Sequence, residues 1–191
     1  MRPMHLGIDL DGVLADFNSA FIETLAEVTG RALILKGTIP TVWDYPQFYG
    51  YTAAETSRVW EHIKGAKRWW LELAPLPGAH QFFSNLNWRM DETTFITSRP
   101  GATAKEQSQE WLGFFLDEEP EVVIAHDKGP VYEALGISHV LDDKPSHVHA
   151  ALEAGCKAIL LAQPWNVVER PALVRRGAIV IESLEDFWRH L

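Results

Sequence analysis

The sequence predicts an α/β fold in which a mostly parallel sheet is covered by helices on both faces, with a small helical cap inserted after the first β-α unit. Short apolar runs with the length of buried strands recur along the chain, and stretches with the helical spacing of apolar residues separate them. One segment, residues 31–74, has no strand pattern. Strands that alternate with helices favour right-handed crossovers, which give a parallel sheet buried on both faces.

The chain opens with a β-loop-α unit. Residues 5–10 form a short apolar run that ends in acid and glycine, as expected of a buried strand. Residues 17–28 then have helical spacing, and Gly30 is placed to end that helix. The acidic residues are therefore expected at the carboxyl end of the first strand.

Residues 31–74 are expected to form the cap, because they contain many aromatic side chains and no good strand. Thr52 followed by Glu55 is the pattern of a capping box, which predicts a helix start at this point. Proline and glycine at residues 75–78 mark the return to the sheet.

The remainder of the chain alternates regularly between the two kinds of element. Strands are expected at residues 93–97, 122–125, 139–141, 158–161 and 178–181, and helices at 79–88, 103–116, 130–135, 146–154 and 184–190. Thr103, with Glu106 three residues later, and Ser183 are expected to begin two of these helices.

Composition and charge restrict the class of protein. A chain of 191 residues with 47% hydrophobic residues can bury one ordinary core, and its one cysteine excludes an intramolecular disulfide framework. The formal net charge of −9 repels a nucleic-acid backbone, so no duplex nucleic acid is expected as a partner. No apolar run reaches the length of a membrane span, and the start lacks the plan of a signal peptide. We expect a cytoplasmic protein without a membrane partner. Whether the chain forms a homodimer is left open.

Four successive strands end in residues that suit phosphoryl transfer. In chain order these residues are Asp9 and Asp11, Thr97, Lys128, and Asp142 with Asp143. Because the carboxyl ends of parallel strands meet at one edge of a sheet, the side chains are expected to converge. Each has an ordinary structural explanation, since an Asp after a strand is commonly a turn former and a lysine is commonly solvated. Four strand ends with complementary chemistry make a phosphoryl-transfer site the better interpretation.

A carboxylate site would repel a phosphate monoester unless a divalent cation lies between them. Mg²⁺ prefers oxygen ligands and commonly takes one or two carboxylates. Asp9, Asp143 and Asp142 are the candidate carboxylate ligands, with the Asp11 carbonyl as a further one. The residues alone leave open which carboxylate of the Asp142–Asp143 pair binds the ion directly.

The same residues can be given catalytic roles. Asp9 is free to attack phosphorus and form an aspartyl-phosphate, while Asp11 protonates the leaving oxygen and later activates water. Lys128 adds positive charge, and Thr97 donates a hydrogen bond to a phosphoryl oxygen.

These residues resemble the four motifs of the haloacid dehalogenase (HAD) superfamily of phosphohydrolases. Asp9 to Gly12 is similar to its first motif, Thr97 to its second, Lys128 to its third and the Asp142–Asp143 pair to its fourth. The resemblance implies a Rossmann-like core at residues 1–30 and 75–191 and a helical cap at 31–74, to which helix 17–29 also contributes. Dehalogenases lack the second Asp of the first motif, so Asp11 implies a phosphatase, and the resemblance favours Asp143 as the metal ligand.

Within the superfamily, residues 9–17, 73–79 and 141–144 resemble the 5′(3′)-deoxyribonucleotidases. The resemblance implies Mg²⁺-dependent hydrolysis of nucleoside 5′-monophosphates, with aromatic side chains of the cap stacking on the base. The substrate contacts that it implies or places near the substrate are Phe17, Trp43, Tyr45, Trp60, Ser98 and Arg99.

Other functions use related residues. The substrate of the same chemistry could be a sugar phosphate or a nucleic-acid 3′-phosphate. A phospho-accepting signalling module also uses clustered Asp, Thr and Lys residues, but its acceptor lies on a middle strand and it has no cap. A metal-binding scaffold without activity is a further alternative, although no motif position is missing.

Overall fold

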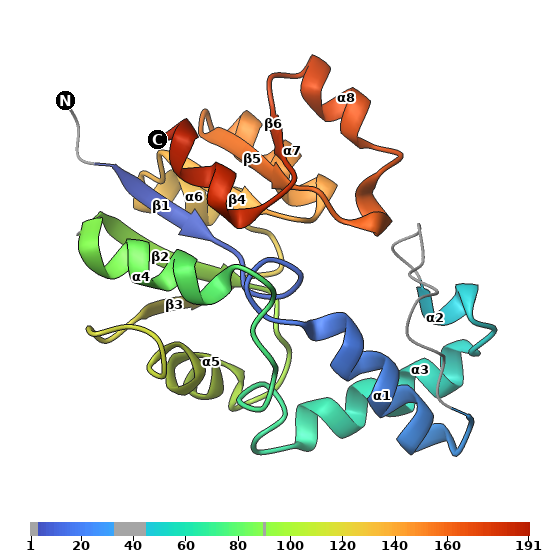
Figure 1. Ribbon diagram of the computed structural model, residues 1–191. Helices are drawn as coiled ribbons and strands as arrows, with labels where there is room; N and C mark the ends of the chain where they lie inside the picture. The colour runs from blue at the N-terminus through green and yellow to red at the C-terminus, as the bar shows by residue number, and fades with distance from the viewer. Residues whose placement is uncertain (1–3, 33–44, 90) are drawn as a thin grey trace.

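The computed structural model describes residues 4–32, 45–89 and 91–191, and its centre is one parallel sheet (Figure 1). The described strands lie in the order β3-β2-β1-β4-β5-β6, and every neighbouring pair is parallel. The strands are β1 (His5–Ile8), β2 (Glu92–Thr97), β3 (Glu121–Ile124), β4 (His139–Asp142), β5 (Lys157–Leu161) and β6 (Ile179–Ile181). The predicted α/β class is confirmed.

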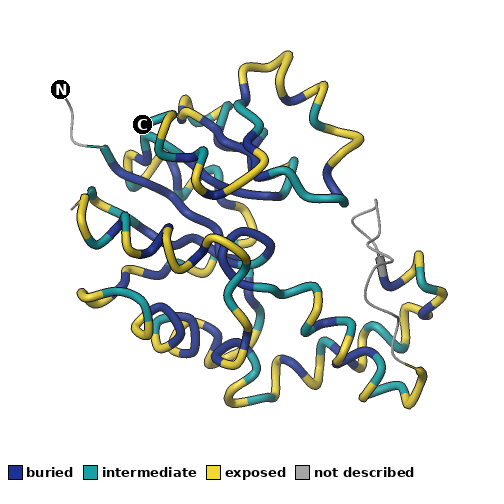
Figure 2. The backbone as a smooth tube through the Cα atoms, viewed as in Figure 1, coloured by how far each residue is buried: buried dark blue, intermediate teal, exposed yellow. Residues whose placement is uncertain are grey.

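Helices cover both faces of the sheet because successive strand residues point to opposite sides. Phe95 of β2 belongs to a hydrophobic cluster with buried residues of α4 (Ala79–Arg89), α5 (Ala104–Leu112) and η2 (Leu184–His190). Its neighbour Ile96 belongs to a second cluster, with buried residues of α6 (Gly129–Leu135), α7 (Pro145–Glu153) and α8 (Arg170–Arg175). In Figure 2 the inner strands β1, β4 and β5 are buried almost throughout and the edge strands β3 and β6 less so, while the helices are exposed on their outer turns. None of the helices in these described ranges combines the length and apolar character that a membrane crossing requires.

Three helices lie to one side of the sheet: α1 (Phe17–Thr29), α2 (Tyr45–Phe48) and α3 (Ala53–Gly65) (Figure 1). Helix α3 starts with the predicted capping box, in which the Thr52 amide donates to Glu55 Oε2 at 2.7 Å and the Glu55 amide donates to Thr52 Oγ1 at 3.2 Å. Helices α1 and α3 pack together through the buried residues Phe21, Leu25, Val59 and Ile63.

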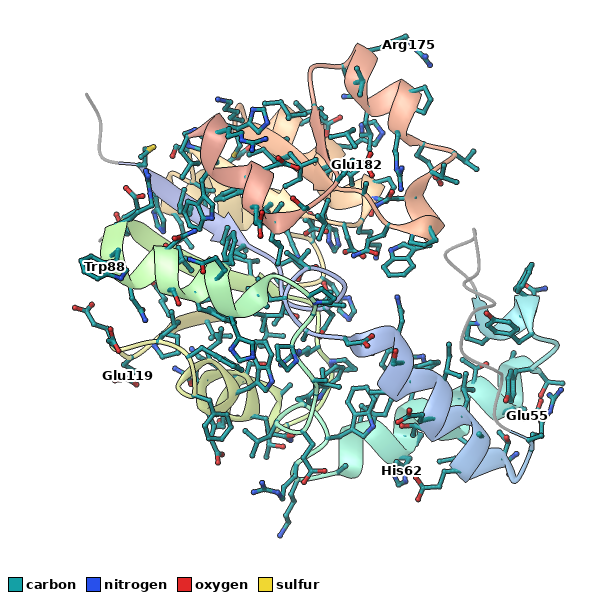
Figure 3. All side chains as sticks on the ribbon, viewed as in Figure 1. Glu55, His62, Trp88, Glu119, Arg175 and Glu182 are labelled. Atoms are coloured by element: carbon teal, nitrogen blue, oxygen red, sulfur yellow. The ribbon has the colours of Figure 1, made fainter. Side chains whose placement is uncertain are left out.

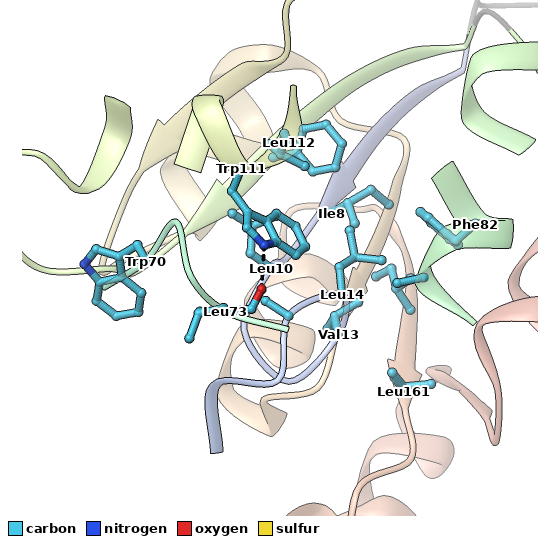
Figure 4. Packing of buried hydrophobic residues seen from close by; sticks show 14 of the residues in the cluster. Ile8, Leu10, Val13, Leu14, Trp70, Leu73, Phe82, Trp111, Leu112 and Leu161 are labelled. Carbon is cyan, nitrogen blue, oxygen red and sulfur yellow. Dashed lines mark hydrogen bonds between the residues drawn. The ribbon is translucent and has the colours of Figure 1, made fainter. Parts of the chain in front are cut away.

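The chain leaves the sheet and returns to it at one junction. The Asp16 amide donates to the Ala74 carbonyl at 2.8 Å, and the Leu76 amide donates to the Leu14 carbonyl at 2.7 Å. Close by, Trp111 Nε1 donates to the Leu73 carbonyl at 2.8 Å (Figure 4). We keep residues 31–74, together with α1, as the proposed cap.

Some predictions about single elements were wrong. Helix α5 ends at Leu112 instead of residue 116. Thr103 is its N-cap residue, as predicted, but Thr103 Oγ1 accepts a hydrogen bond from the Gln107 side chain and makes no capping bond to the helix backbone. The last helix is a 3₁₀ helix. Ser183 is its N-cap residue, as predicted, but Ser183 Oγ donates to Asp186 Oδ2 and makes no capping bond to the helix backbone. Helix α8 was not predicted, because its six residues are too short to show a period.

Candidate active site

The carboxyl ends of β1, β2, β3 and β4 meet at a cavity of about 650 Å³. Strand β1 lies between β2 and β4, so Asp9, Thr97 and Asp142 stand at three adjacent strand ends. The Asp9 amide continues the ladder by donating to the Leu141 carbonyl at 2.9 Å. Lys128 lies between the end of β3 and the start of α6.

A buried ion-pair network joins three of these residues. Lys128 Nζ lies 2.9 Å from Asp9 Oδ1 and 2.7 Å from Asp142 Oδ2, and Lys128 is only 1% exposed. His147 Nδ1 lies 3.0 Å from Asp142 Oδ2, and the Lys144 amide donates to Asp142 Oδ1 at 2.8 Å. Both oxygens of Asp142 are therefore occupied by protein donors.

Burial and neighbouring charges set the protonation of this network. Burial, together with the charge of Asp142, outweighs Lys128 and raises the pKa of Asp9 to about 6. Burial opposes ionisation of Asp142 too, but Lys128 and His147 hold its pKa below the ordinary value. Burial would lower the pKa of Lys128, yet Asp142 and Asp9 raise it. Above pH 6 the Asp9 carboxylate is thus mainly ionised and faces a stable cation.

Asp143 lies in a different environment from Asp142. Its Oδ2 accepts a hydrogen bond from Trp165 Nε1 at 2.7 Å, while its buried Oδ1 has no hydrogen-bond partner among the residues that the structure describes. Burial and the charges of Asp142 and Asp9 raise the pKa of Asp143 well above its ordinary value. Gly12 is required beside it, since a Cβ at this position would lie 2.3 Å from Asp143 Oδ2 and the φ of Gly12 is +79°.

These contacts indicate where a cation fits. The oxygens of Asp9, Asp142 and a nitrogen of His147 lie within 4.8 Å of one another, but the Lys128 ammonium pairs with both carboxylates and would repel a metal ion there. The orphan oxygen of Asp143 is the better ligand, because a buried polar atom without a partner is costly. Lys128 meets Asp9 through Oδ1, so we keep Asp9 together with Asp143 and the Asp11 carbonyl as the candidate ligands of a divalent cation.

Asp143→Asn is expected to stabilise the metal-free protein at neutral and alkaline pH. Because the pKa of Asp143 is raised in the folded state, the folded protein binds this proton more tightly than the unfolded chain, and its contribution to stability falls as pH rises through the folded-state pKa. Asparagine removes that loss. We expect a gain of about 1–3 kcal/mol at pH 8 that shrinks as pH falls, measured by urea unfolding with a chelator present. The exposed Asp127→Asn serves as control, and a gain that grew toward acid pH would contradict the expectation.

Asp11 and Arg99 form a second charged pair at the edge of the cavity. Arg99 Nη2 lies 2.8 Å from Asp11 Oδ1, and Arg99 Nε lies 3.0 Å from Asp11 Oδ2. Thr97 Oγ1 donates to Asp11 Oδ2 over a longer 3.4 Å. Ser98, which also lines the cavity, donates its hydroxyl to the Ala125 carbonyl at 2.8 Å. The sequence placed Arg99 near the substrate, and the structure gives it a protein partner as well.

Aromatic side chains line the same cavity as the carboxylates. Phe17, Trp60 and Trp70 line the cavity. The Phe17 and Trp60 rings stack with centroids 5.9 Å apart and an interplanar angle of 17°. A base inserted between them would need about 7 Å, two carbon contacts of about 3.5 Å each. The space between these two rings is therefore closed to a third ring, and Phe17 also stacks with Trp70, with centroids 6.0 Å apart and an interplanar angle of 14°.

Two further residues, Trp43 and Tyr45, were predicted to contact the substrate. Trp43 lies outside the described residues, and Tyr45 is described only as the first backbone position of α2. Among the other tryptophans, Trp88 is 87% exposed and lies at the far end of the sheet from the three side helices (Figure 3).

The sequence did not identify the segment after β5 as part of the site. Gln163 Nε2 donates to the Gly12 carbonyl at 2.7 Å, and Asn166 Nδ2 donates to the Asp143 carbonyl at 2.8 Å. Trp165 lies between them in the 3₁₀ helix η1 (Pro164–Asn166). The rule that sites gather at the carboxyl ends of strands would have pointed to this segment, since it follows β5 directly.

The chain matches a known family and is similar in fold to solved structures. The family model of the 5′ nucleotidase, deoxy (pyrimidine), cytosolic type C protein matches residues 2–172. A predicted phosphatase from Clostridium acetobutylicum is similar with a TM-score of 0.67 at 16% identity, over 98% of this chain and 97% of that chain. A haloacid dehalogenase-like hydrolase from Streptococcus pneumoniae has a TM-score of 0.65 at 12% identity, over 98% of each chain. A HAD family hydrolase from Deinococcus radiodurans with bound phosphate and sodium has a TM-score of 0.61 at 15% identity, over 97% of this chain and 93% of that chain. No curated protein sequence matches the chain.

Proposed function

Since the chain belongs to the 5′ nucleotidase, deoxy (pyrimidine), cytosolic type C family of the haloacid dehalogenase superfamily, we propose that it hydrolyses nucleoside 5′-monophosphates, preferably deoxyribonucleotides, with Mg²⁺ and an aspartyl-phosphate intermediate. Family membership makes it a phosphoric monoester hydrolase that acts on a small phosphate ester, so the signalling-module alternative is not retained. The observation that carries the finer proposal is the Asp9 carboxyl group, which pairs with buried Lys128 and lines a cavity that aromatic side chains also line.

The first half of the reaction forms the intermediate. A carboxylate oxygen of Asp9 attacks phosphorus, and the bond between phosphorus and the ester oxygen breaks. Asp11 gives its proton to that leaving oxygen, so the nucleoside departs as an alcohol. Lys128 holds the Asp9 carboxylate in place, since its Nζ lies 2.9 Å from Asp9 Oδ1.

The second half restores the protein. Asp11 takes a proton from water, whose oxygen attacks phosphorus, and the bond between phosphorus and Asp9 breaks to release inorganic phosphate. The Thr97 hydroxyl can donate to a phosphoryl oxygen in both halves, because its present bond to Asp11 is long, at 3.4 Å.

Asp9, Asp143 and the Asp11 carbonyl are the residues that would hold Mg²⁺. When bound, the ion supplies positive charge that offsets the phosphate dianion beside the carboxylates. Trp165 fixes one oxygen of Asp143 and leaves the other for the ion. The partner group of a metal-binding carboxylate commonly fixes its orientation in this way.

The cavity supports a nucleotide as the substrate. Its volume of about 650 Å³ lies within the range of small-molecule sites, about 300–1,000 Å³. Phe17 and Trp60 offer apolar ring surface in the same cavity as the carboxylates, on which a base can stack. A sugar phosphate would leave this surface uncovered.

Phosphate release from a panel of esters tests the proposal. The panel contains deoxynucleoside and ribonucleoside 5′-monophosphates, sugar phosphates and an oligonucleotide with a 3′-phosphate, each with Mg²⁺ and with a chelator. We expect kcat/KM for the best deoxynucleotide to exceed that for any sugar phosphate by at least about tenfold, because one aromatic stacking contact can contribute a factor of this size. The activity should disappear with chelator and return with Mg²⁺. Faster turnover of sugar phosphates, or full activity without metal, would refute the proposal.

A further inference from the structure

Arg99 is a buried cation that pairs with Asp11. It is 1% exposed, and its Nε lies 3.1 Å from Asp11 Oδ1 and 3.0 Å from Oδ2. Its Nη2 lies 2.8 Å from Asp11 Oδ1, so the planar group grips the carboxylate as a fork. The remaining nitrogen, Nη1, donates to Ser108 Oγ at 2.9 Å.

The guanidinium is itself held from several sides. It lies over the rings of Trp70, at 4.9 Å, and Trp111, at 6.0 Å. Both indoles are tied to the backbone, since Trp70 Nε1 donates to the Pro100 carbonyl at 3.2 Å and Trp111 Nε1 donates to the Leu73 carbonyl at 2.8 Å. Ser108 Oγ in turn donates to the Ala104 carbonyl at 2.7 Å. An arginine packed in this way has little freedom to turn toward a ligand.

Asp11 depends on this contact for its orientation. It stands on the loop after β1, outside any helix or named strand. Apart from Arg99, the side-chain hydrogen bond that the described residues give its carboxylate is the long one from Thr97, at 3.4 Å. A misplacement of about 1 Å in a reacting group can cost about 10²-fold in rate, so the group that fixes this carboxylate also affects the chemistry.

We infer that Arg99 is a positioning residue for Asp11, holding the carboxyl group where its protonated form, regenerated when Asp11 takes a proton from water, can pass that proton to the leaving oxygen. The inference rests on the proposed function, in which Asp11 is the general acid and base. It differs from a direct phosphate contact, the other role open to a cation at this cavity. The two roles differ in which substrates they affect, because a contact to phosphate serves every ester equally, whereas proton donation matters only when the leaving group needs a proton.

The leaving group therefore provides the test. We compare two esters. The nucleoside of a deoxynucleoside 5′-monophosphate leaves as an alkoxide unless it is protonated, whereas the p-nitrophenolate of p-nitrophenyl phosphate leaves without a proton. The quantity is kcat/KM, which reports the steps up to release of the first product. The ratio between the two esters is unaffected by any inactive fraction of the preparation, so a partly unfolded variant still gives an answer.

Arg99→Ala is expected to lower kcat/KM for the nucleotide by about 10²-fold or more and for p-nitrophenyl phosphate by less than about tenfold. Asp11→Asn should show the same selectivity, and the double variant should be no worse than Asp11→Asn alone, since the two residues act as one unit. Inhibition by inorganic phosphate should change less than about threefold. Arg99→Lys keeps the charge but loses the fork, and it should recover only part of the loss.

Two further variants complete the design. Ser108→Ala removes one support of the guanidinium and should shift the ratio in the same direction by a smaller factor, about threefold. The exposed Arg176→Ala is the control and should leave the ratio unchanged. Equal losses for both esters, weaker phosphate inhibition and losses that add to those of Asp11→Asn would overturn the inference and make Arg99 a phosphate contact. If the unaltered protein hydrolyses neither ester, the proposed function fails instead.

Discussion

Asp9→Asn is expected to abolish phosphate release, by a factor on the order of 10⁶ in kcat, the loss seen when a nucleophile is removed from a covalent mechanism. The amide has the shape of the carboxylate, but its oxygen is too weak a nucleophile to attack phosphorus. The fold should persist, because Lys128 keeps Asp142 as its partner at 2.7 Å. The measurement is phosphate release from the best nucleotide of the panel with Mg²⁺ present.

A second measurement examines the intermediate itself. After acid quenching with a ³²P-labelled nucleotide, the unaltered protein should carry label that hydroxylamine removes, as an acyl phosphate would, and Asp9→Asn should carry none. The surface variant Asp186→Asn is a matched control, since that carboxylate pairs only with nearby Arg189 and Ser183 in the described structure. Residual turnover of Asp9→Asn above about one hundredth of normal, or label on that variant, would exclude Asp9 as nucleophile.

Lys128→Ala is expected to lose both activity and stability. The substitution leaves Asp9 and Asp142 as neighbouring carboxylates, both buried, without the cation that lies 2.9 and 2.7 Å from them. Breaking a buried ion pair on one side costs about 3–5 kcal/mol. Loss of positive charge at the phosphate site should lower kcat by about 10²–10³-fold as well.

The pH dependence of that loss identifies its cause. Without Lys128 the folded-state pKa values of the two carboxylates rise, so the folded protein binds more protons than the unfolded chain, and lowering the pH favours the fold. The deficit in the free energy of unfolding should therefore be larger at pH 8 than at pH 5, by urea unfolding. Lys105→Ala, at an exposed position of α5, should stay within about 0.5 kcal/mol. A Lys128→Ala protein as stable as the unaltered one at pH 8 would refute the buried network as a support of the fold.

Much of the fold follows from local patterns. The apolar run at residues 5–10, the capping box of Thr52 and Glu55, and the alternation of strands with helices all reappear in the structure at nearly the predicted bounds. These features depend on neighbouring residues, and period and capping chemistry are expressed over a few positions. Elements without such a period, such as α8, were missed for the same reason.

What the sequence alone determined is the α/β class and the set of acidic, hydroxyl and lysine side chains that gather at one edge of the sheet, because parallel topology places the carboxyl end of every strand on that edge. Only the tertiary structure decided how those residues pair. Arg99 reaches Asp11 across 88 positions of the chain, and Trp165 reaches Asp143 across 22. The structure also favours Asp143 over Asp142 as the ligand with an oxygen to offer. Such pairings depend on strand register, loop course and packing, and these arise from contacts between segments that no local pattern encodes.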